Sequence, residues 1–208
     1  MADWSTIASL ATAGGTLLLA VATFSSTRSA NQSARMAERA MLAGLRPLLL
    51  TSRPQDLAEK VMWSDEHFAK VLGGQGVAEE IDGVVYLAAG LRNVGAGVAV
   101  LHGWHLYVGW DTERPPTDPD RFHRLTRDLY IASGDTGFWQ GAIRAPDDPE
   151  RKAVAEAIAG HERLTVDVLY GDQEGGQRTI SRLAFTWHAD VWRCATSRHW
   201  NLDRDDPR

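Results

Sequence analysis

The first 27 residues restrict the fold of this chain more than any other stretch. No charged residue occurs from Trp4 to Thr27, and leucine, valine and phenylalanine supply most of the apolar bulk. A helix of about 20 such residues, rising about 1.5 Å per residue, crosses a bilayer hydrocarbon core of about 30 Å. Trp4 stands where an interfacial aromatic residue is expected. The sequence therefore predicts a transmembrane anchor over residues 1–27.

Two other interpretations of this run stay open. A cleaved signal peptide also has an apolar stretch, but it needs a positively charged start, and this chain begins Met-Ala-Asp. A buried helix of a soluble core is the second alternative, although an uncharged run of this length is long for one. Serine, threonine and glycine dilute the run, which membrane helices tolerate because hydroxyl groups bond back to helix carbonyls.

The charges on either side of the run predict its direction in the membrane. Only Asp3 precedes it, whereas arginines follow it. These arginines are Arg28, Arg35, Arg39, Arg46 and Arg53. By the positive-inside rule, the arginine-bearing side faces the cytoplasm. We therefore expect a single-pass protein of the cell membrane, with its N-terminus outside and its C-terminal domain in the cytoplasm.

Small residues recur along the predicted anchor. Ala8, Ala11 and Gly15 are three and four residues apart, which places them on one helix face. Small residues at this spacing let two membrane helices approach closely, so they are candidates for forming a homo-oligomer. The alternative is that a weakly selected span simply tolerates small residues.

The rest of the chain divides by its hydropathy pattern. Residues 28–46 keep apolar residues at helical spacing and end at Gly44 and Pro47, which predicts a juxtamembrane helical stalk. Residues 47–200 show about eight short runs typical of strands, separated by turn residues. One helix start is expected at Asp147–Glu150. Residues 201–208 are charged and predict a flexible tail.

These patterns predict a mainly β fold. The strands do not alternate with helices, so a doubly wound parallel sheet is not expected. We expect an antiparallel β-sandwich, or a small barrel, with one inserted short helix, preceded by the transmembrane and juxtamembrane helices. The segment 56–72 fits either a helix or a strand.

Two segments carry a resemblance to a known fold. They are VVYLAAGLRNVGAGVAVLHGWHLYV, with its Asn-x-Gly corner, and LTVDVLYGDQEGGQRTISRLAFTW, with Tyr-x-Asp before a glycine turn. They are similar to the strands and late hairpin of bacterial immunoglobulin-like sandwiches. The whole layout resembles a group of uncharacterised bacterial single-pass membrane proteins that carry such a domain in the cytoplasm. The resemblance implies a fold and a layout, and it implies no activity and no site residues.

Composition and motifs indicate no reaction. The net charge of −5 without clustered lysine and arginine argues against nucleic acid as a partner. The seven histidines form no metal-binding motif, and His102 and His105 point to opposite faces of a predicted strand. The lone Cys194 is expected to be a small core residue rather than a nucleophile. Gly73–Gly76 lacks the Lys-Ser/Thr of a phosphate loop. We therefore predict no catalytic residue, no metal and no cofactor.

Tryptophan is the unusual component, with eight residues in the chain. Tryptophan is enriched at recognition surfaces, and arginine beside it can stack on a nucleotide or peptide. Trp104, Trp192, Arg193 and Arg198 are therefore candidates for a binding surface. The alternative is that these tryptophans fill a β-sandwich core.

Three functions are compatible with this layout. The first is a membrane-anchored, non-enzymatic binding or sensing module for an unknown cytoplasmic protein or small ligand. The second is a ligand-gated membrane effector of the bacterial defence type, whose transmembrane helix oligomerises. A membrane-bound hydrolase ranks last, because no nucleophile and base were found together.

Overall fold

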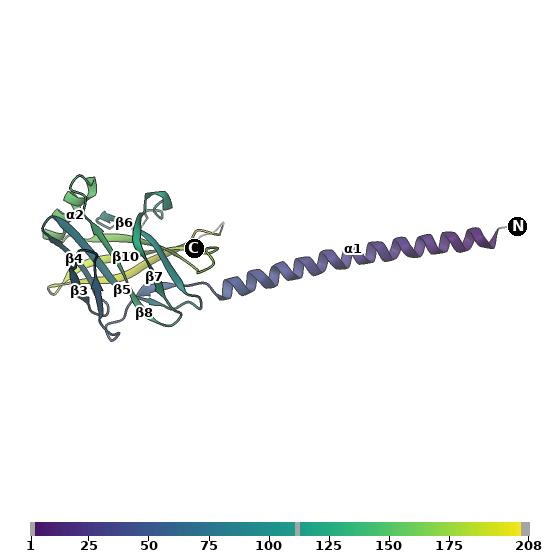
Figure 1. The fold of residues 1–208 in the computed structure, drawn as a ribbon, viewed down its shortest axis with the longest axis horizontal. Helices are drawn as coiled ribbons and strands as arrows, with labels where there is room; N and C mark the ends of the chain where they lie inside the picture. The colour runs from purple at the N-terminus through teal and green to yellow at the C-terminus, as the bar shows by residue number, and fades with distance from the viewer. Residues whose placement is uncertain (1–2, 111–112, 205–208) are drawn as a thin grey trace. The chain divides into compact units, whose positions relative to one another are not determined.

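A computed structural model describes residues 3–110 and 113–204 of the chain (Figure 1). Within helix α1, the side chains of residues 4–11, 39, 42 and 43 lie outside the described part. The chain forms two compact units, Met1–Gly44 and Leu45–Arg208, and each is described by itself.

The first unit is one continuous helix, α1, from Trp4 to Gly44. It joins both helical segments expected from the sequence and ends just before Pro47, which cannot continue a helix. Its threonines bond back to the helix. For example, the hydroxyl of Thr16 donates to the carbonyl of Thr12 at 2.9 Å, and that of Thr23 donates to Leu19 at 2.8 Å.

The predicted transmembrane anchor over residues 1–27 finds no support in the described residues. Within them, no helix combines the length and apolarity that a membrane crossing requires. Ala8 and Ala11 belong to α1, but their side chains lie outside the described part of the structure. A Cβ built on Gly15 would meet no described atom within 4 Å.

The second unit is mainly β, as the sequence predicts, and all its strand pairings are antiparallel. The first strands are β1 (Leu49–Thr51), β2 (Glu59–Met62), β3 (Phe68–Val71), β4 (Gly76–Ile81), β5 (Val84–Asn93) and β6 (Ala99–Val108). The later ones are β7 (His123–Ile131), β8 (Thr136–Ile143), β9 (Leu164–Gly171), β10 (Arg178–His188) and β11 (Val191–Asn201). A 3₁₀ turn, η1, spans Pro119–Arg121, and helix α2 spans Pro149–Ala159.

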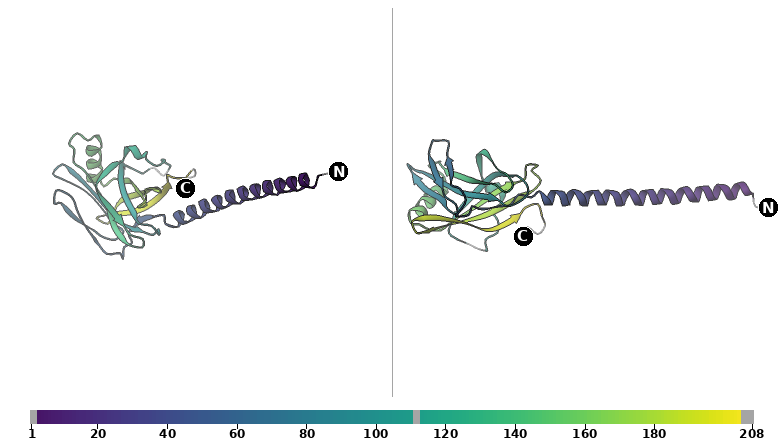
Figure 2. Two further views of the ribbon diagram at one scale, coloured as in Figure 1. Left: turned by 45° about the vertical axis from the view of Figure 1, so that its right-hand side comes forward. Right: turned by 90° about the horizontal axis from the view of Figure 1, so that it is seen from below.

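Two main sheets make up this unit. One has the order β11-β10-β9-β6-β7. In the other, β5 is central, with β8 on one side and β4 and β1 along the other side. The blue strands of the second sheet and the yellow strands β10 and β11 form separate layers in the right-hand view of Figure 2. The hairpin β2–β3 forms a small sheet of its own.

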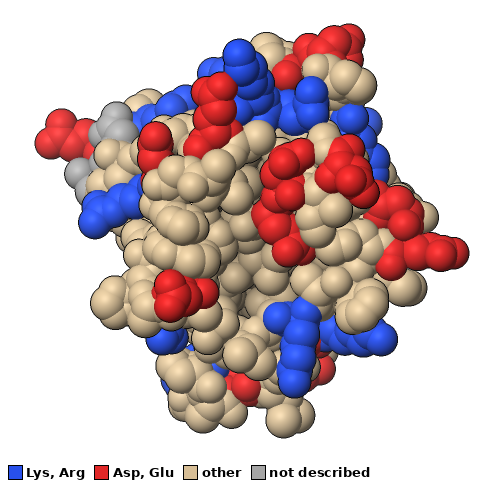
Figure 3. Space-filling model, turned by 90° about the vertical axis from the view of Figure 1, so that its left-hand side faces the viewer, with Lys and Arg blue, Asp and Glu red and all other residues tan. Residues whose placement is uncertain are grey.

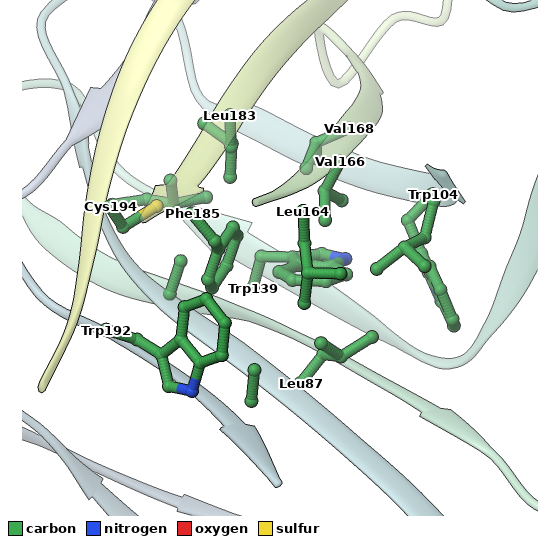
Figure 4. Close-up of a cluster of buried hydrophobic side chains, with 14 of the residues drawn as sticks. Leu87, Trp104, Trp139, Leu164, Val166, Val168, Leu183, Phe185, Trp192 and Cys194 are labelled. Carbon is green, nitrogen blue, oxygen red and sulfur yellow. The ribbon is translucent and has the colours of Figure 1, made fainter. Parts of the chain in front are cut away.

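The main core lies between the two sheets. It is built from alternating residues of both, such as Leu87 of β5, Trp139 of β8, Val166 of β9 and Phe185 of β10. Trp139 lies in the middle of the labelled side chains in Figure 4. A second cluster, which includes Val61 and Tyr86, packs the β2–β3 hairpin against the outer face of β5.

Two sequence signals lead to specific local structure. Asp82 and Gly83 both have positive φ, as in the tight turns that join two antiparallel strands, and they connect β4 to β5. At the Asn-x-Gly corner, the buried amide of Asn93 donates to the carbonyls of Gly97 and Ile131 at 2.6 and 3.0 Å. Its oxygen accepts from the backbone N–H of Leu48 at 3.2 Å. The corner therefore ties together three separate segments.

The fold decides one open expectation and corrects another. The ambiguous segment 56–72 contains the hairpin β2–β3, so the strand alternative holds there. Residues 201–204 of the predicted tail belong to the folded unit, because Asn201 ends β11 and Asp203 forms an ion pair with Arg46. Residues 205–208 lie outside the described part.

Candidate functional site

The four candidate binding residues do not form one surface. Trp104 lies in β6 and is 3% exposed, and Trp192 lies in β11 and is 6% exposed. Strands β9 and β10 separate these two strands in the same sheet. Arg193 is exposed and Arg198 half-buried, both on β11. The two tryptophans belong to the core cluster, where they bury large apolar area.

Trp104 nevertheless contacts His123, which belongs to a polar cluster at the five-stranded sheet. Its ring packs edge-on against Trp139, with 5.6 Å between ring centroids, and stacks on His123 at 4.6 Å. His123 is the first residue of β7 and is half-exposed. The stack therefore connects the buried core to the surface.

Glu150 lies between two histidines at this place. Its Oε2 is 3.7 Å from Nε2 of His123, and its Oε1 is 3.9 Å from Nε2 of His105 on β6. Glu150 stands in the first turn of α2, whose N-cap is Asp148 with Pro149 next to it. Acidic side chains are favoured there by the partial positive charge of the helix start. Both separations are longer than a hydrogen bond.

A cavity of about 260 Å³ opens beside this cluster. Its wall comes from β6, from η1 with the loop before it, and from the first turns of α2. The polar residues of the wall are His105, Tyr107, Arg114, Arg121 and Glu150. Arg114 lies over the ring of Tyr107, with its guanidinium carbon 4.1 Å from the ring centroid. We call this cavity the α2 cavity.

The loop that carries Arg114 is held by a buried ion pair. Arg182 of β10 and Asp167 of β9 are cross-strand partners, and their side chains meet at 2.7 Å. The guanidinium of Arg182 also donates to the backbone carbonyls of Arg114 and Pro115, at 2.8 and 3.0 Å. Asp167 accepts from the hydroxyl and the N–H of Thr117. One wall of the α2 cavity therefore depends on a buried charge pair.

A second, smaller hollow adjoins the cluster on the other side of His123. It measures about 180 Å³ and lies between β7 and β8, the facing edge strands of the two sheets. The pairing of β7 with β6 shifts between Leu101 and Gly103, which leaves residues 125–128 of β7 without a partner in β6. Such a bulge redirects side chains. Arg127 from this stretch donates to Gln140 of β8 at 3.0 Å.

Burial sets the protonation of the inner histidine. Desolvation lowers the pKa of His105, and the nearby carboxylate of Glu150 only partly opposes this effect. His105 is therefore neutral at neutral pH.

Across the face shown in Figure 3, acidic and basic side chains are interspersed.

This arrangement is suited to binding through mixed polar contacts. It combines a carboxylate, a neutral imidazole, a phenol and two guanidinium groups around one cavity. Among the described residues, no group of histidine, cysteine, aspartate or glutamate has a geometry that could hold a metal ion. No local sequence signal marks this cluster, because His105, His123 and Glu150 come from three separate elements and share no motif.

Cys194 is placed in the core, where burial strongly raises the pKa of its thiol. A buried thiol that stays protonated is a poor nucleophile. We expect iodoacetamide to leave Cys194 unmodified in the folded protein at pH 8 and to alkylate it fully in denaturant, as read by intact mass. Rapid alkylation of the folded protein would contradict the placement of this thiol.

No family model matches this chain, and no curated protein sequence matches it.

Proposed function

We propose that this protein is a non-enzymatic binding module that helix α1 attaches to a membrane. The observation that carries the attachment is the exposure of large apolar side chains on α1. They are Leu17, Leu18, Leu19, Val21 and Phe24, each at least 61% exposed on the helix as described. Exposed apolar surface on this scale marks a contact with lipid or with another protein.

The distribution of these side chains favours lipid over a single partner helix. Leu17, Leu18 and Leu19 follow one another, and consecutive helix residues are about 100° apart around the axis. They therefore cover much more than one stripe of the helix. A partner helix needs only a narrow apolar seam, whereas a helix that is apolar on all sides suits a bilayer. The charge-free run from Trp4 to Thr27 supports the same proposal.

The orientation and the self-association stay part of this proposal. The arginines that follow Thr27 favour a cytoplasmic β unit. Ala8, Ala11 and Gly15 remain candidates for a helix contact between two copies, since they share one face of α1.

We also propose that the β unit is an immunoglobulin-like sandwich. In that fold, strand B pairs with E in one sheet, while C pairs with F, and F with G, in the other. Strands β5 and β8 correspond to B and E, and the order β7-β6-β9-β10 corresponds to C′-C-F-G. Trp104 on β6 takes the place of the buried tryptophan of strand C. Loops at the ends of such sandwiches commonly carry the binding site, which agrees with the position of the α2 cavity.

Membrane fractionation of the full chain tests the attachment. We expect the wild-type protein to stay in the membrane pellet after carbonate washing. The double variant Leu17→Arg/Val21→Arg should move mainly to the soluble fraction, because each arginine at the centre of a span costs about 2.5–3.5 kcal/mol. A matched variant, Met36→Arg/Met41→Arg, alters two exposed residues of the same helix beyond the charge-free run and should stay in the pellet.

Two outcomes would defeat the attachment. One is a wild-type protein that is soluble without detergent. The other is an equal distribution of the two double variants between pellet and soluble fraction. In that case the charge-free run would contribute no more to the attachment than the rest of α1. Protease treatment of intact cells then reads the orientation, since a cytoplasmic β unit should survive it.

A further inference from the structure

The wall of the α2 cavity contains side-chain atoms that are buried without a hydrogen bond among the described residues. They are Nδ1 of His105 and Oε2 of Glu150. The side chain of His105 is 96% buried, from a relative exposure of 4%. A buried polar atom that lacks a partner is costly, and such atoms are rare in folded proteins. Their concentration around one cavity points to a molecule that completes them.

The unmatched atoms of His105 and Glu150 are acceptors. The Nε2 atom of His105 faces the carboxylate of Glu150, so the neutral ring is assigned the tautomer with its proton on Nε2. Its Nδ1 is then left as an acceptor. The Oε2 atom of Glu150 lies 3.7 Å from Nε2 of His123 and accepts no hydrogen bond from the described part of the chain. It is also an acceptor, because an ionised carboxylate donates nothing. The occupant must therefore bring hydrogen-bond donors to this side of the cavity.

The lining of the cavity also contains two arginines. Arg121 ends η1, is exposed, and forms no ion pair with a carboxylate of residues 3–110 or 113–204. The guanidinium carbon of Arg114 lies 4.1 Å from the centroid of the Tyr107 ring at the same cavity. Guanidinium groups bind carboxylates and phosphates through two parallel hydrogen bonds. The occupant must therefore also carry an anionic group.

We propose that the α2 cavity binds a small organic anion that carries a hydroxyl or amino group a few bonds from its phosphate or carboxylate. The anionic group contacts Arg121 and Arg114, and the donor group contacts Glu150 and His105. A fully ionised inorganic anion has no donor for these acceptors and would face the charge of Glu150. A simple cation would face two arginines. The volume of about 260 Å³ suits a molecule of this small size.

This ligand class rests on one part of the proposed function, namely that the β unit is a binding domain. It does not depend on the attachment of α1 to a membrane.

Calorimetric titration of the full chain in mild detergent tests the ligand class with three matched probes. Glycerol phosphate carries both groups, methyl phosphate carries only the anion, and glycerol carries only the donors. We expect glycerol phosphate to bind at least about tenfold more tightly than methyl phosphate, since one hydrogen bond to a charged group is worth at least that factor. Glycerol should give no measurable heat.

Two variants test the contact with the anionic group and the contact with the donor group separately. Arg121→Gln should weaken both phosphates by about tenfold or more, because it removes the anion contact. Glu150→Gln should instead reduce the preference for glycerol phosphate over methyl phosphate. The control is Arg124→Gln, which alters an exposed arginine of the neighbouring hollow and should change neither affinity. Unchanged thermal midpoints without ligand confirm that each variant is folded.

Equal affinity for all probes, no heat from any of them, or equal weakening by Arg121→Gln and Arg124→Gln would overturn the proposal. In each case the cavity would hold only water or would attract anions through general charge. These results are separate from the fractionation. A protein that leaves the membrane pellet yet binds glycerol phosphate refutes the anchor alone, and a membrane-bound protein that ignores the probes refutes the ligand class alone.

Discussion

Replacing Asp167 by alanine is expected to destabilise the β unit by about 3–5 kcal/mol. The side chain of Asp167 is fully buried and that of Arg182 nearly so, and they are joined at 2.7 Å. Removing the carboxylate leaves the guanidinium buried in a medium that solvates charge poorly. Arg182 keeps its bonds to the carbonyls of Arg114 and Pro115, but these do not neutralise its charge. Chemical denaturation of the full chain, followed by tryptophan fluorescence, measures the loss.

Two further variants separate the loss of an interaction from the exposure of a buried charge. Asp167→Ala/Arg182→Leu removes both partners and should be more stable than Asp167→Ala alone, because no charge is left buried without a partner. Lys152→Ala breaks the pair with Glu156 on the surface of α2, where both side chains are largely exposed. It should change stability by no more than about 1 kcal/mol. Similar effects of Asp167→Ala and Lys152→Ala would refute a special role for the buried pair.

Replacing Trp139 by alanine should destabilise the same unit by about 3–5 kcal/mol. The side chain is 0% exposed and packs edge-on against Trp104 and Phe185, at 5.6 and 6.5 Å between ring centroids. It therefore joins β6 and β10 of one sheet to β8 of the other. Its removal leaves a cavity that these neighbours fill only in part, so the loss exceeds that from transfer of the side chain alone. Denaturant unfolding with far-UV circular dichroism gives the free energy without relying on tryptophan fluorescence.

Trp110→Ala provides the matched comparison. Trp110 follows β6 and is 41% exposed, so the same chemical change there removes less buried area than at position 139. We therefore expect a smaller loss of stability than for Trp139→Ala. If both variants lose the same stability, the large effect comes from tryptophan content rather than from the position between the sheets.

The binding residues could not be predicted from the sequence. Tryptophan beside arginine is typical of recognition surfaces, yet the rings of Trp104 and Trp192 are both buried. Tryptophan serves cores and interfaces through the same large apolar area, so its occurrence in a strand does not distinguish the two. His105, His123 and Glu150 are, when each is taken alone, two ordinary histidines and an acidic residue at a helix start.

Local chemistry was sufficient for the elements whose signals lie within a few residues. The strand Leu164–Gly171 and the Pro149 helix start each appear where the sequence predicts them. The reason is that strand propensity and helix capping are decided largely by neighbouring residues. The tertiary structure alone decided which strands pair, and it brought His105, His123 and Glu150 together from three elements. Contacts between residues far apart in the chain depend on how whole sheets and helices pack, and a single sequence contains no local signal for them.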